Sequence, residues 1–292
     1  MNFNLTRIAP TPSGFLHLGN AYSFLKTKAL AEKHGAKILL RIDDLDRDRY
    51  RPEYVQDIFD TLDFLEIPID LGPKNLQEFE NEWSQIHRMK MYTEGMDRLR
   101  STGKLFACDC SRKKIQQLDP SGYYLGQCLE RRLSLDKPEV AWRMDTSESD
   151  VVHFIEYPDQ KKTAFIPQDS LFYVARKKDG MPAYQLTSLL DDLHFGVDLI
   201  VRGKDLFPST LAQLDLARNL GEEKFRQITF HHHSLIKSPE QVKLSKSAGA
   251  TSIQYLRKEG KNLQEILGII GKWIGHEVPI STFENFKSVQ KK

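Results

Sequence analysis

Apolar and polar positions in the first part of the chain follow the order strand, helix, strand. Residues 3–8 (FNLTRI) form a short apolar run that stops before two prolines, which predicts a strand. Residues 19–35 show helical spacing and finish on a glycine, a common end of helices. Residues 37–42 (KILLRI) are typical of a buried strand. This βαβ pattern predicts a parallel sheet in an α/β fold.

Two further helices are expected before the pattern changes. One follows Pro52, because apolar residues recur there on one helical face: Val55, Ile58, Phe59, Leu62 and Leu65. The other covers residues 82–101 and ends before Gly103.

Residues 104–182 consist of short β-like runs (AWRM, VVHFIEY, SLFYVARKK) between polar turns, which predicts an insertion domain. Helix-like and strand-like patterns resume over residues 183–203. We therefore expect three parts. Residues 1–103 and 183–292 form the two halves of a core around the insertion, and the second half ends in a tail with room for one or two helices.

The composition limits the class of protein. Of 292 residues, 40% are hydrophobic and 28% are charged, the balance of a soluble globular chain. The net charge of +2 is nearly neutral, so any nucleic-acid contact has to come from local patches. The sequence has no apolar run long enough for a membrane span and no signal-peptide stretch at its start. We expect a cytoplasmic monomer.

The first candidate site is the turn between the first strand and helix, residues 9–20 (APTPSGFLHLGN). Pro10 and Pro12 stiffen the turn, and its glycines let a ligand approach the backbone. The N-terminus of the following helix favours phosphate, and His17 is placed to donate to an oxyanion during phosphoryl or adenylyl transfer. A rigid turn with a capping histidine explains this stretch equally well.

The second candidate is the run KLSKS at residues 243–247, followed by Ala248 and Gly249. The ammonium groups of Lys243 and Lys246 can neutralise a developing pyrophosphate if the loop moves. Taken alone, a solvated basic loop is the better explanation.

Together and in this order, the two motifs resemble the signatures of class I aminoacyl-tRNA synthetases. Residues 17–20 (HLGN) are similar to the HIGH motif, and residues 243–247 to the KMSKS motif. Residues 7–14 (RIAPTPSG), 40–46 (LRIDDLD) and 200–206 (IVRGKDL) are similar to motifs of the glutamyl subgroup. The resemblance implies a Rossmann-like core, with a doubly wound parallel sheet that binds a nucleotide.

The resemblance also implies an amino-acid site. Asp43 is expected to hold the substrate ammonium, and Arg202 the side-chain carboxylate. Taken singly, Asp43 is better explained as a solvated carboxylate and Arg202 as a surface ion pair. Glutamyl enzymes usually have glutamate at the position of Asp43, and glutaminyl relatives have aspartate, but Arg202 favours glutamate. The implied glutamate-binding residues are Arg7, Ile8, Ala9, Pro10, Thr11, Asp43, Tyr184 and Arg202.

The catalytic groups are implied in the same way. ATP is expected at His17, Gly19, Asn20 and Lys246, with Mg²⁺ on its phosphates. The glutamate carboxylate attacks the α-phosphate, giving glutamyl-adenylate and pyrophosphate. His17, Asn20, Lys243 and Lys246 are the expected catalytic residues, and positioning and electrostatics carry the rate because no protein nucleophile is needed.

The cysteines Cys108, Cys110 and Cys128 lie close together in the sequence, and the C-x-C spacing indicates a metal more than a disulfide. Three free thiols are the alternative, and the pattern alone leaves the fourth ligand open. C-x-C followed by Tyr-x-x-x-Cys is similar to the zinc site of glutamyl-queuosine tRNA(Asp) synthetases. That resemblance implies a structural Zn²⁺ in the insertion, with Tyr124 as fourth ligand.

The same subgroup is implied by the short stretch after the KMSKS-like motif, where glutamyl-tRNA synthetases carry an anticodon-binding region. The implied activity is tRNA-independent activation of L-glutamate and its transfer to the queuosine base of tRNA(Asp). Three alternatives stay open. They are a reduced glutamyl-tRNA synthetase that charges a tRNA 3′ end, a tRNA-binding module without catalysis, and another nucleotidyltransferase on this fold.

The histidines at residues 231–233 follow a strand-like stretch, residues 225–230. The family resemblance implies that one of them lies near the nucleotide, and we do not expect them to bind a metal.

Overall fold

The computed structural model describes residues 1–148, 151–236 and 252–289. The chain forms two compact units, one from residues 1–87, 201–204 and 233–292, and the other from residues 88–200 and 205–232. Residues 104–182 lie entirely within the second unit. The three-part division expected from the sequence stays a prediction.

The first unit begins with the βαβ arrangement that the sequence predicts. Strands β1 (Leu5–Ile8) and β2 (Lys37–Leu40) pair in parallel, and helix α1 (Leu18–His34) connects them. The helix ends at Gly35, whose φ of 69° is left-handed and is adopted by glycine without steric cost. The prediction of strand, helix and strand is confirmed here.

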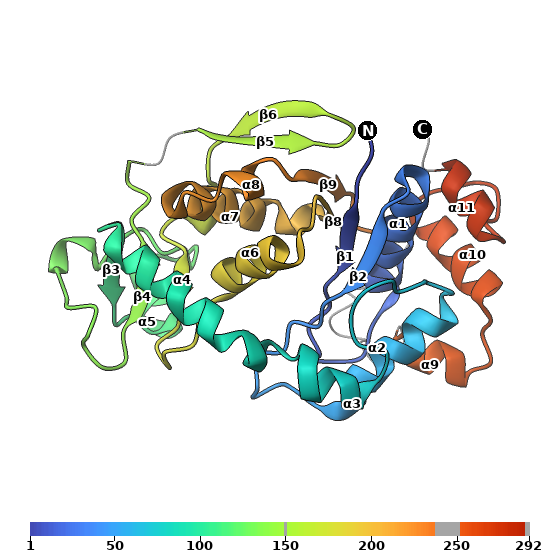
Figure 1. Ribbon diagram of the computed structural model, residues 1–292, viewed down its shortest axis with the longest axis horizontal. Helices are drawn as coiled ribbons and strands as arrows, with labels where there is room; N and C mark the ends of the chain where they lie inside the picture. Colours follow the sequence, from blue (N-terminus) through green and yellow to red (C-terminus); the bar gives the residue numbers. More distant parts are fainter. Residues whose placement is uncertain (149–150, 237–251, 290–292) are drawn as a thin grey trace. The chain divides into compact units, whose positions relative to one another are not determined.

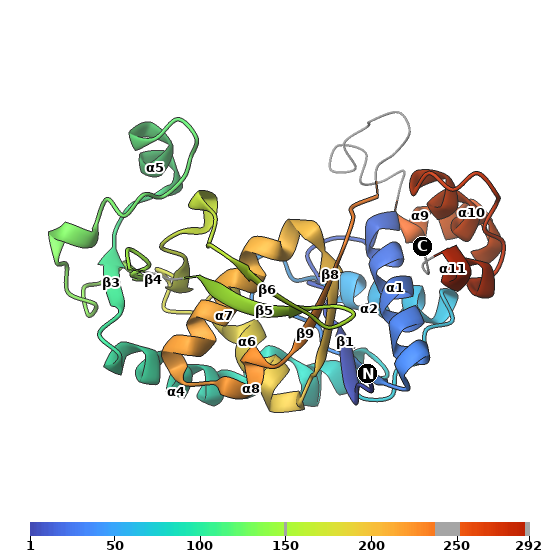
Figure 2. The same cartoon turned by 90° about the horizontal axis from the view of Figure 1, so that it is seen from above.

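Helix α2 (Pro52–Phe64) is also confirmed, with Pro52 in its first turn and the expected apolar face buried. The tail holds three helices among its described residues, so the expectation of one or two was wrong. Figure 2 shows these helices grouped beside α1, and α10 packs on both α1 and α11. The remaining helices of this unit are α3 (Leu76–Glu78), α9 (Ile253–Lys258), α10 (Leu263–Trp273) and α11 (Phe283–Val289).

The prediction of a helix over residues 82–101 is wrong for its first turns. The chain forms a π-helical turn (Phe79–Trp83) and a 3-10 turn (Gln85–Arg88) before helix α4 (Met89–Ser101) starts. Between the two turns, Ser84 is extended with ψ 142°. Its hydroxyl donates to the buried Asp44 carboxylate at 2.6 Å. A contact between residues distant in sequence therefore interrupts a segment whose local pattern is helical.

In the second unit, a three-stranded antiparallel sheet has the order β3-β4-β7. Helix α6 packs on α4 and α7, and the buried Asp191 of α6 accepts hydrogen bonds from Arg88 and Tyr92, both at 2.7 Å. The elements are β3 (Leu105–Cys108), α5 (Arg112–Leu118), β4 (Ala141–Met144), β7 (Val174–Arg176), α6 (Tyr184–Phe195), α7 (Phe207–Leu220) and α8 (Glu223–Arg226).

Two strand expectations need correction. The run SLFYVARKK contributes only the three residues of β7, after a 3-10 turn at Gln168–Ser170. The stretch at residues 225–230 contains the end of helix α8 and only the start of a strand, β9 (Thr229–His233). The three histidines therefore lie within β9 and do not follow a strand.

The larger sheet has six strands in the order β2-β1-β8-β9-β5-β6 (Figure 1). Strand β8 (Leu199–Gly203) neighbours β1. Strand β5 (Val152–Glu156) runs parallel to β9 but antiparallel to β6 (Gln160–Ala164), because a short turn joins β5 and β6. The sheet is therefore mixed, where the sequence predicted a parallel one. Among the described residues, no helix is long and apolar enough to cross a membrane.

Candidate functional site

The turn from β1 into α1 is fixed by reciprocal capping bonds. His17 Nδ1 accepts hydrogen bonds from the backbone N–H groups of Gly19 (3.0 Å) and Asn20 (3.3 Å), and Asn20 Oδ1 accepts from the His17 N–H (3.0 Å). A Cβ at position 19 would lie 2.9 Å from the His17 ring, so the site needs Gly19. The HIGH-like residues are a helix cap, which is one of the two explanations that the sequence left open.

The cap also determines which imidazole nitrogen of His17 carries the proton. Burial lowers the pKa of His17, which favours the neutral ring at pH 7. Because Nδ1 accepts hydrogen bonds, the proton of the neutral ring resides on Nε2. An N–H donor at the positive end of a helix dipole is suited to an anion. The capping role therefore does not exclude the catalytic role, which stays a prediction.

Three residues expected to bind glutamate are buried in the first unit. Arg7 of β1 is 5% exposed, Arg202 of β8 is 3% exposed, and Asp43, just after β2, is 7% exposed. Arg7 Nη1 donates to the carbonyl oxygen of Val201 at 3.2 Å, across the neighbouring strands β1 and β8. Two buried guanidinium groups on adjacent strands concentrate positive charge, which favours an anionic ligand.

Asp43 is not the solvated carboxylate that the single residue suggests. Arg41 binds it through two hydrogen bonds, from Nε to Oδ1 at 2.8 Å and from Nη2 to Oδ2 at 3.0 Å. The Asp43 N–H donates to the carbonyl oxygen of Pro10 at 2.9 Å, which ties this segment to the turn after β1. Sequence reasoning missed Arg41. Its signal was the spacing of two residues, which places both side chains on one face of an extended segment.

Two further buried aspartates position this region and were also missed. Asp44 accepts hydrogen bonds from Ser84 and from the N–H of Gln85, the latter at 2.8 Å. Asp57 of α2 accepts from the N–H of Leu16 at 2.8 Å, and burial raises the pKa of its carboxyl. Only the fold reveals these contacts, because each pair is separated by about 40 residues.

The other sequence-predicted residues have varied placements. Ile8 and Pro10 are buried, Ala9 is half-buried and Thr11 is exposed, all in the first unit. Tyr184 is the first residue of α6 in the second unit and is 40% exposed. The KMSKS-like residues Lys243 and Lys246 lie outside the described residues.

The histidines of β9 make contacts within the protein. His232 Nδ1 contacts Glu156 Oε2 at 2.7 Å, and its Nε2 contacts Thr210 Oγ1 at 2.6 Å. His233 Nε2 contacts Ser23 Oγ at 3.1 Å. His232 therefore braces β9 against β5 and α7, and nucleotide contact by one of the histidines stays a prediction.

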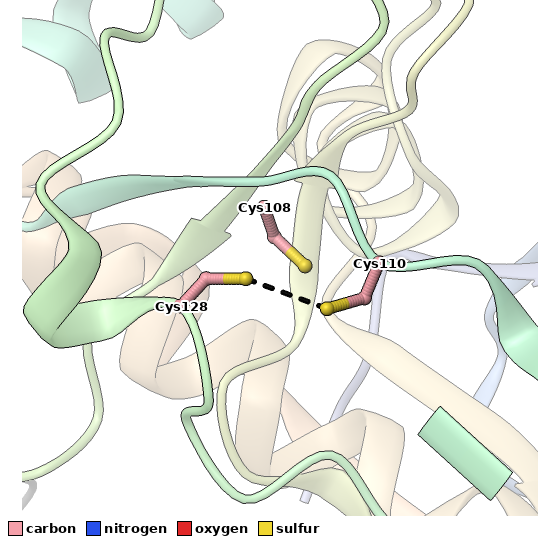
Figure 3. Close-up of side chains that lie close together, drawn as sticks. All are labelled: Cys108, Cys110 and Cys128. Carbon is pink, nitrogen blue, oxygen red and sulfur yellow. Dashed lines mark hydrogen bonds between the residues drawn. The ribbon is translucent and has the colours of Figure 1, made fainter. Parts of the chain in front are cut away.

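The three cysteines converge in the second unit, as a shared metal site requires. Their sulfur atoms lie within 4.8 Å of one another, with Cys110 and Cys128 at 3.4 Å (Figure 3). Thiolates around a tetrahedral zinc, each about 2.3 Å from the metal, are about 3.8 Å apart, so the cluster fits this ion. The Tyr124 hydroxyl accepts a hydrogen bond from the Cys128 N–H at 3.0 Å. The cluster thus brings three sulfurs together, and Tyr124 as fourth ligand stays a prediction.

The surroundings of the cluster favour a thiolate at Cys128 but not at Cys110. Burial raises the pKa of the Cys110 thiol to about 12. Burial acts in the same direction on Cys128, but hydrogen bonds from Tyr124, Cys110 and Arg131 lower its pKa to about 7. Arg131 lies 3.3 Å from the Cys128 sulfur and pairs with Asp109. Among the described residues, this is the one group of three or more potential metal-ligating side chains that lie close together.

Comparison with known proteins decides the family. The model of the family described as "tRNA synthetases class I (E and Q), catalytic domain" matches residues 5–278 of this chain. This chain belongs to that family. The family resemblance drawn from the HIGH-like and KMSKS-like motifs is thereby confirmed, and the chain is an aminoacyl-tRNA synthetase-like ligase.

The relatives of this synthetase carry two names. A Glutamyl-Q tRNA(Asp) synthetase of Rhodobacter capsulatus is 31% identical over 91% of this chain and 99% of its own length. A glutamate–tRNA ligase of Ectopseudomonas mendocina is also 31% identical, over 94% of this chain but only 57% of its own length. The chain thus spans little more than half the length of this ligase.

A solved structure shows the same fold. The glutamate tRNA ligase of Elizabethkingia meningosepticum, in complex with its amino acid, superimposes with a TM-score of 0.72 at 20% identity. The match covers 99% of this synthetase and 70% of that chain. The Rossmann-like α/β class expected from the sequence is therefore confirmed, with a mixed sheet.

Proposed function

We propose that this synthetase activates L-glutamate with ATP in the absence of tRNA and transfers the glutamyl group to the queuosine base of tRNA(Asp). The observation that carries the proposal is its similarity to a Glutamyl-Q tRNA(Asp) synthetase along 99% of that relative's length. The buried arginines Arg7 and Arg202 support an amino acid with an anionic side chain. We expect a monomer in the cytoplasm.

The proposed activation step relies on positioning. Arg202 and Arg7 hold the side-chain carboxylate of glutamate, while Asp43 accepts hydrogen bonds from its ammonium group. Each carboxylate oxygen of Asp43 can accept more than one hydrogen bond, so its bonds to Arg41 are compatible with a contact to the ammonium. The amino acid is thereby oriented with its α-carboxylate directed at the α-phosphate of ATP.

The phosphates are proposed to lie at the start of α1. His17 donates from Nε2 to a phosphate oxygen, and the helix dipole adds positive potential. Gly19 and Asn20 hold the His17 ring through their N–H groups. Lys243 and Lys246 are proposed to neutralise the leaving pyrophosphate, and Mg²⁺ enters with ATP and screens its charge.

We propose a structural zinc held by Cys108, Cys110, Cys128 and Tyr124. The sulfur separations support the three cysteine ligands, and the hydrogen bond from the Cys128 N–H to the Tyr124 hydroxyl keeps this oxygen near the cluster. When bound, such an ion contributes folding free energy to a segment with a small apolar core. The chain's own residues fix the ligands, since Arg131 contacts the Cys128 sulfur and Lys178 donates to the carbonyl oxygen of Asp109 at 2.7 Å.

The first experiment is ATP–pyrophosphate exchange with purified protein. Exchange should require glutamate and proceed without tRNA. Exchange that appears only after tRNA is added contradicts tRNA-independent activation. No exchange under any condition favours a tRNA-binding module that has lost catalysis.

The second experiment identifies the acceptor with radiolabelled glutamate. Label should enter tRNA(Asp) that contains queuosine and should not enter the same tRNA without it. A matched tRNA(Asp) that has queuosine but lacks its 3′-terminal adenosine should be labelled equally well. Label that depends on the 3′ adenosine and not on queuosine supports a glutamyl-tRNA synthetase instead.

A further inference from the structure

The β5–β6 hairpin carries a surface that the proposed amino-acid chemistry does not use. Strand β6 is the last strand of the six-stranded sheet (Figure 1). Its residues Lys161, Lys162 and Thr163 are exposed. In register, Ile155 of β5 lies opposite Lys161, and His153 lies opposite Thr163. The exposed strand is therefore basic and polar. The proposed adenylation step does not use these side chains.

Positive charge surrounds a cavity on this hairpin. Arg226 of the lining pairs with Glu223 of α8 at 2.7 Å, so these two charges offset one another. Lys161 and Lys162 therefore make the lining positive overall. The cavity has a volume of about 260 Å³ and is lined by His153, Phe154, Ile155, Lys161, Lys162, Thr163 and Arg226.

An exposed aromatic ring follows the basic strand. Phe165 is 70% exposed, whereas Phe154 on β5 is buried and packs against Phe207 with ring centroids 5.5 Å apart. Lysines beside an exposed aromatic ring suit unpaired nucleic acid, because the cations contact phosphates while the ring stacks on a base.

We propose that the β5–β6 hairpin docks an unpaired segment of tRNA, with Lys161 and Lys162 on its phosphates and Phe165 stacked on a base. The inference rests on the proposed function in that tRNA is the substrate. Phosphate contacts carry no sequence information, and stacking tolerates every base. The hairpin therefore contributes affinity and does not select the acceptor nucleoside.

Two variants separate the two kinds of contact when tRNA(Asp) binding to the full chain is measured by fluorescence anisotropy across a salt series. The double variant Lys161→Ala/Lys162→Ala should weaken binding on the order of tenfold and flatten the slope of log affinity against log salt by about 1.4, since each phosphate contact on a single strand contributes about 0.7. Phe165→Ala should also weaken binding on the order of tenfold, but with an unchanged slope, because stacking releases no counterions.

The matched control is Lys33→Ala/Lys37→Ala, which removes the same charge from exposed lysines before and at the start of β2. Ligands of α/β folds bind at the other end of the strands, so this control should keep the parent affinity and slope. Glutamate-dependent exchange without tRNA should be equal in all variants, which shows that they fold.

Parent-like binding and slope in both hairpin variants overturn the inference. So does a change confined to self-association in sedimentation, which would mean that β6 pairs with a second copy of the chain. If the parent binds tRNA through the hairpin but never transfers glutamate to it, the proposed function fails and the docking surface stands.

Discussion

Replacing Arg202 should abolish the preference for glutamate over glutamine. Arg202 is 3% exposed on β8, so a ligand carboxylate that reaches it does so in a site largely closed to water. Two charge-assisted hydrogen bonds contribute about 1.5 to 3 kcal/mol each, and hence about 3 to 6 kcal/mol together. Arg202→Ala should therefore reduce kcat/KM for glutamate by roughly 10² to 10⁴.

Glutamine should respond much less to the same change. Its side chain brings no charge to Arg202, so the arginine stabilises it weakly and its loss costs little. Arg202→Lys is the matched control, because it keeps the charge but cannot form the bidentate contact. It should give an intermediate ratio between the two amino acids.

Asp43→Asn should behave differently, since glutamate and glutamine share the ammonium group that Asp43 is proposed to hold. Exchange with both should fall by similar factors. This variant also leaves the buried Arg41 without its carboxylate partner, so thermal melts are needed to show that the protein is folded at the assay temperature. Full discrimination in Arg202→Ala, measured by exchange with both amino acids, refutes the assignment of the pocket.

Four further changes test the site. Lys246→Ala should slow exchange by about 10² to 10³ with little change in glutamate binding, and near-normal exchange would make the loop a bystander. His17→Asn should keep the cap of α1 and the melting temperature of the protein but slow exchange, whereas His17→Ala should also cost about 1 kcal/mol of stability. Equal exchange in the parent and in His17→Asn contradicts the donor role of His17. Freshly purified protein should contain one zinc per chain, and Cys110→Ser should lower both metal content and melting temperature; metal-free parent protein eliminates the site. Burial acts to raise the pKa of Glu156, but hydrogen bonds from His232 hold this pKa below its ordinary value. The Glu156 carboxylate therefore stabilises the fold at pH values above the usual carboxyl range, and this stabilisation is lost as the pH falls through the pKa of the folded protein. Glu156→Gln should cost about 1 to 3 kcal/mol of unfolding free energy at pH 7 in chemical denaturation and progressively less in acid, and a difference that does not depend on pH argues against the pair.

Local sequence determined the elements whose residues interact over one or two turns. Helix α1 follows from helical spacing and from Gly35, since only glycine takes its left-handed φ without cost. Helix α2 follows from its apolar face and from Pro52, whose ring suits a first turn. The spacing of Cys108 and Cys110 likewise indicated a shared ligand, because residues two apart in an extended segment lie on one face.

Tertiary structure alone decided the rest, because those contacts join residues far apart in the sequence. Ser84 breaks a helical pattern because its hydroxyl reaches Asp44, and no property of the local segment reports that partner. His232 is a brace because Glu156 and Thr210 meet it from other elements. The sheet is mixed because a short turn reverses the chain after β5. Spacing could not show that Cys128 returns to within 3.4 Å of Cys110, since the path of the intervening loop depends on the packing around it.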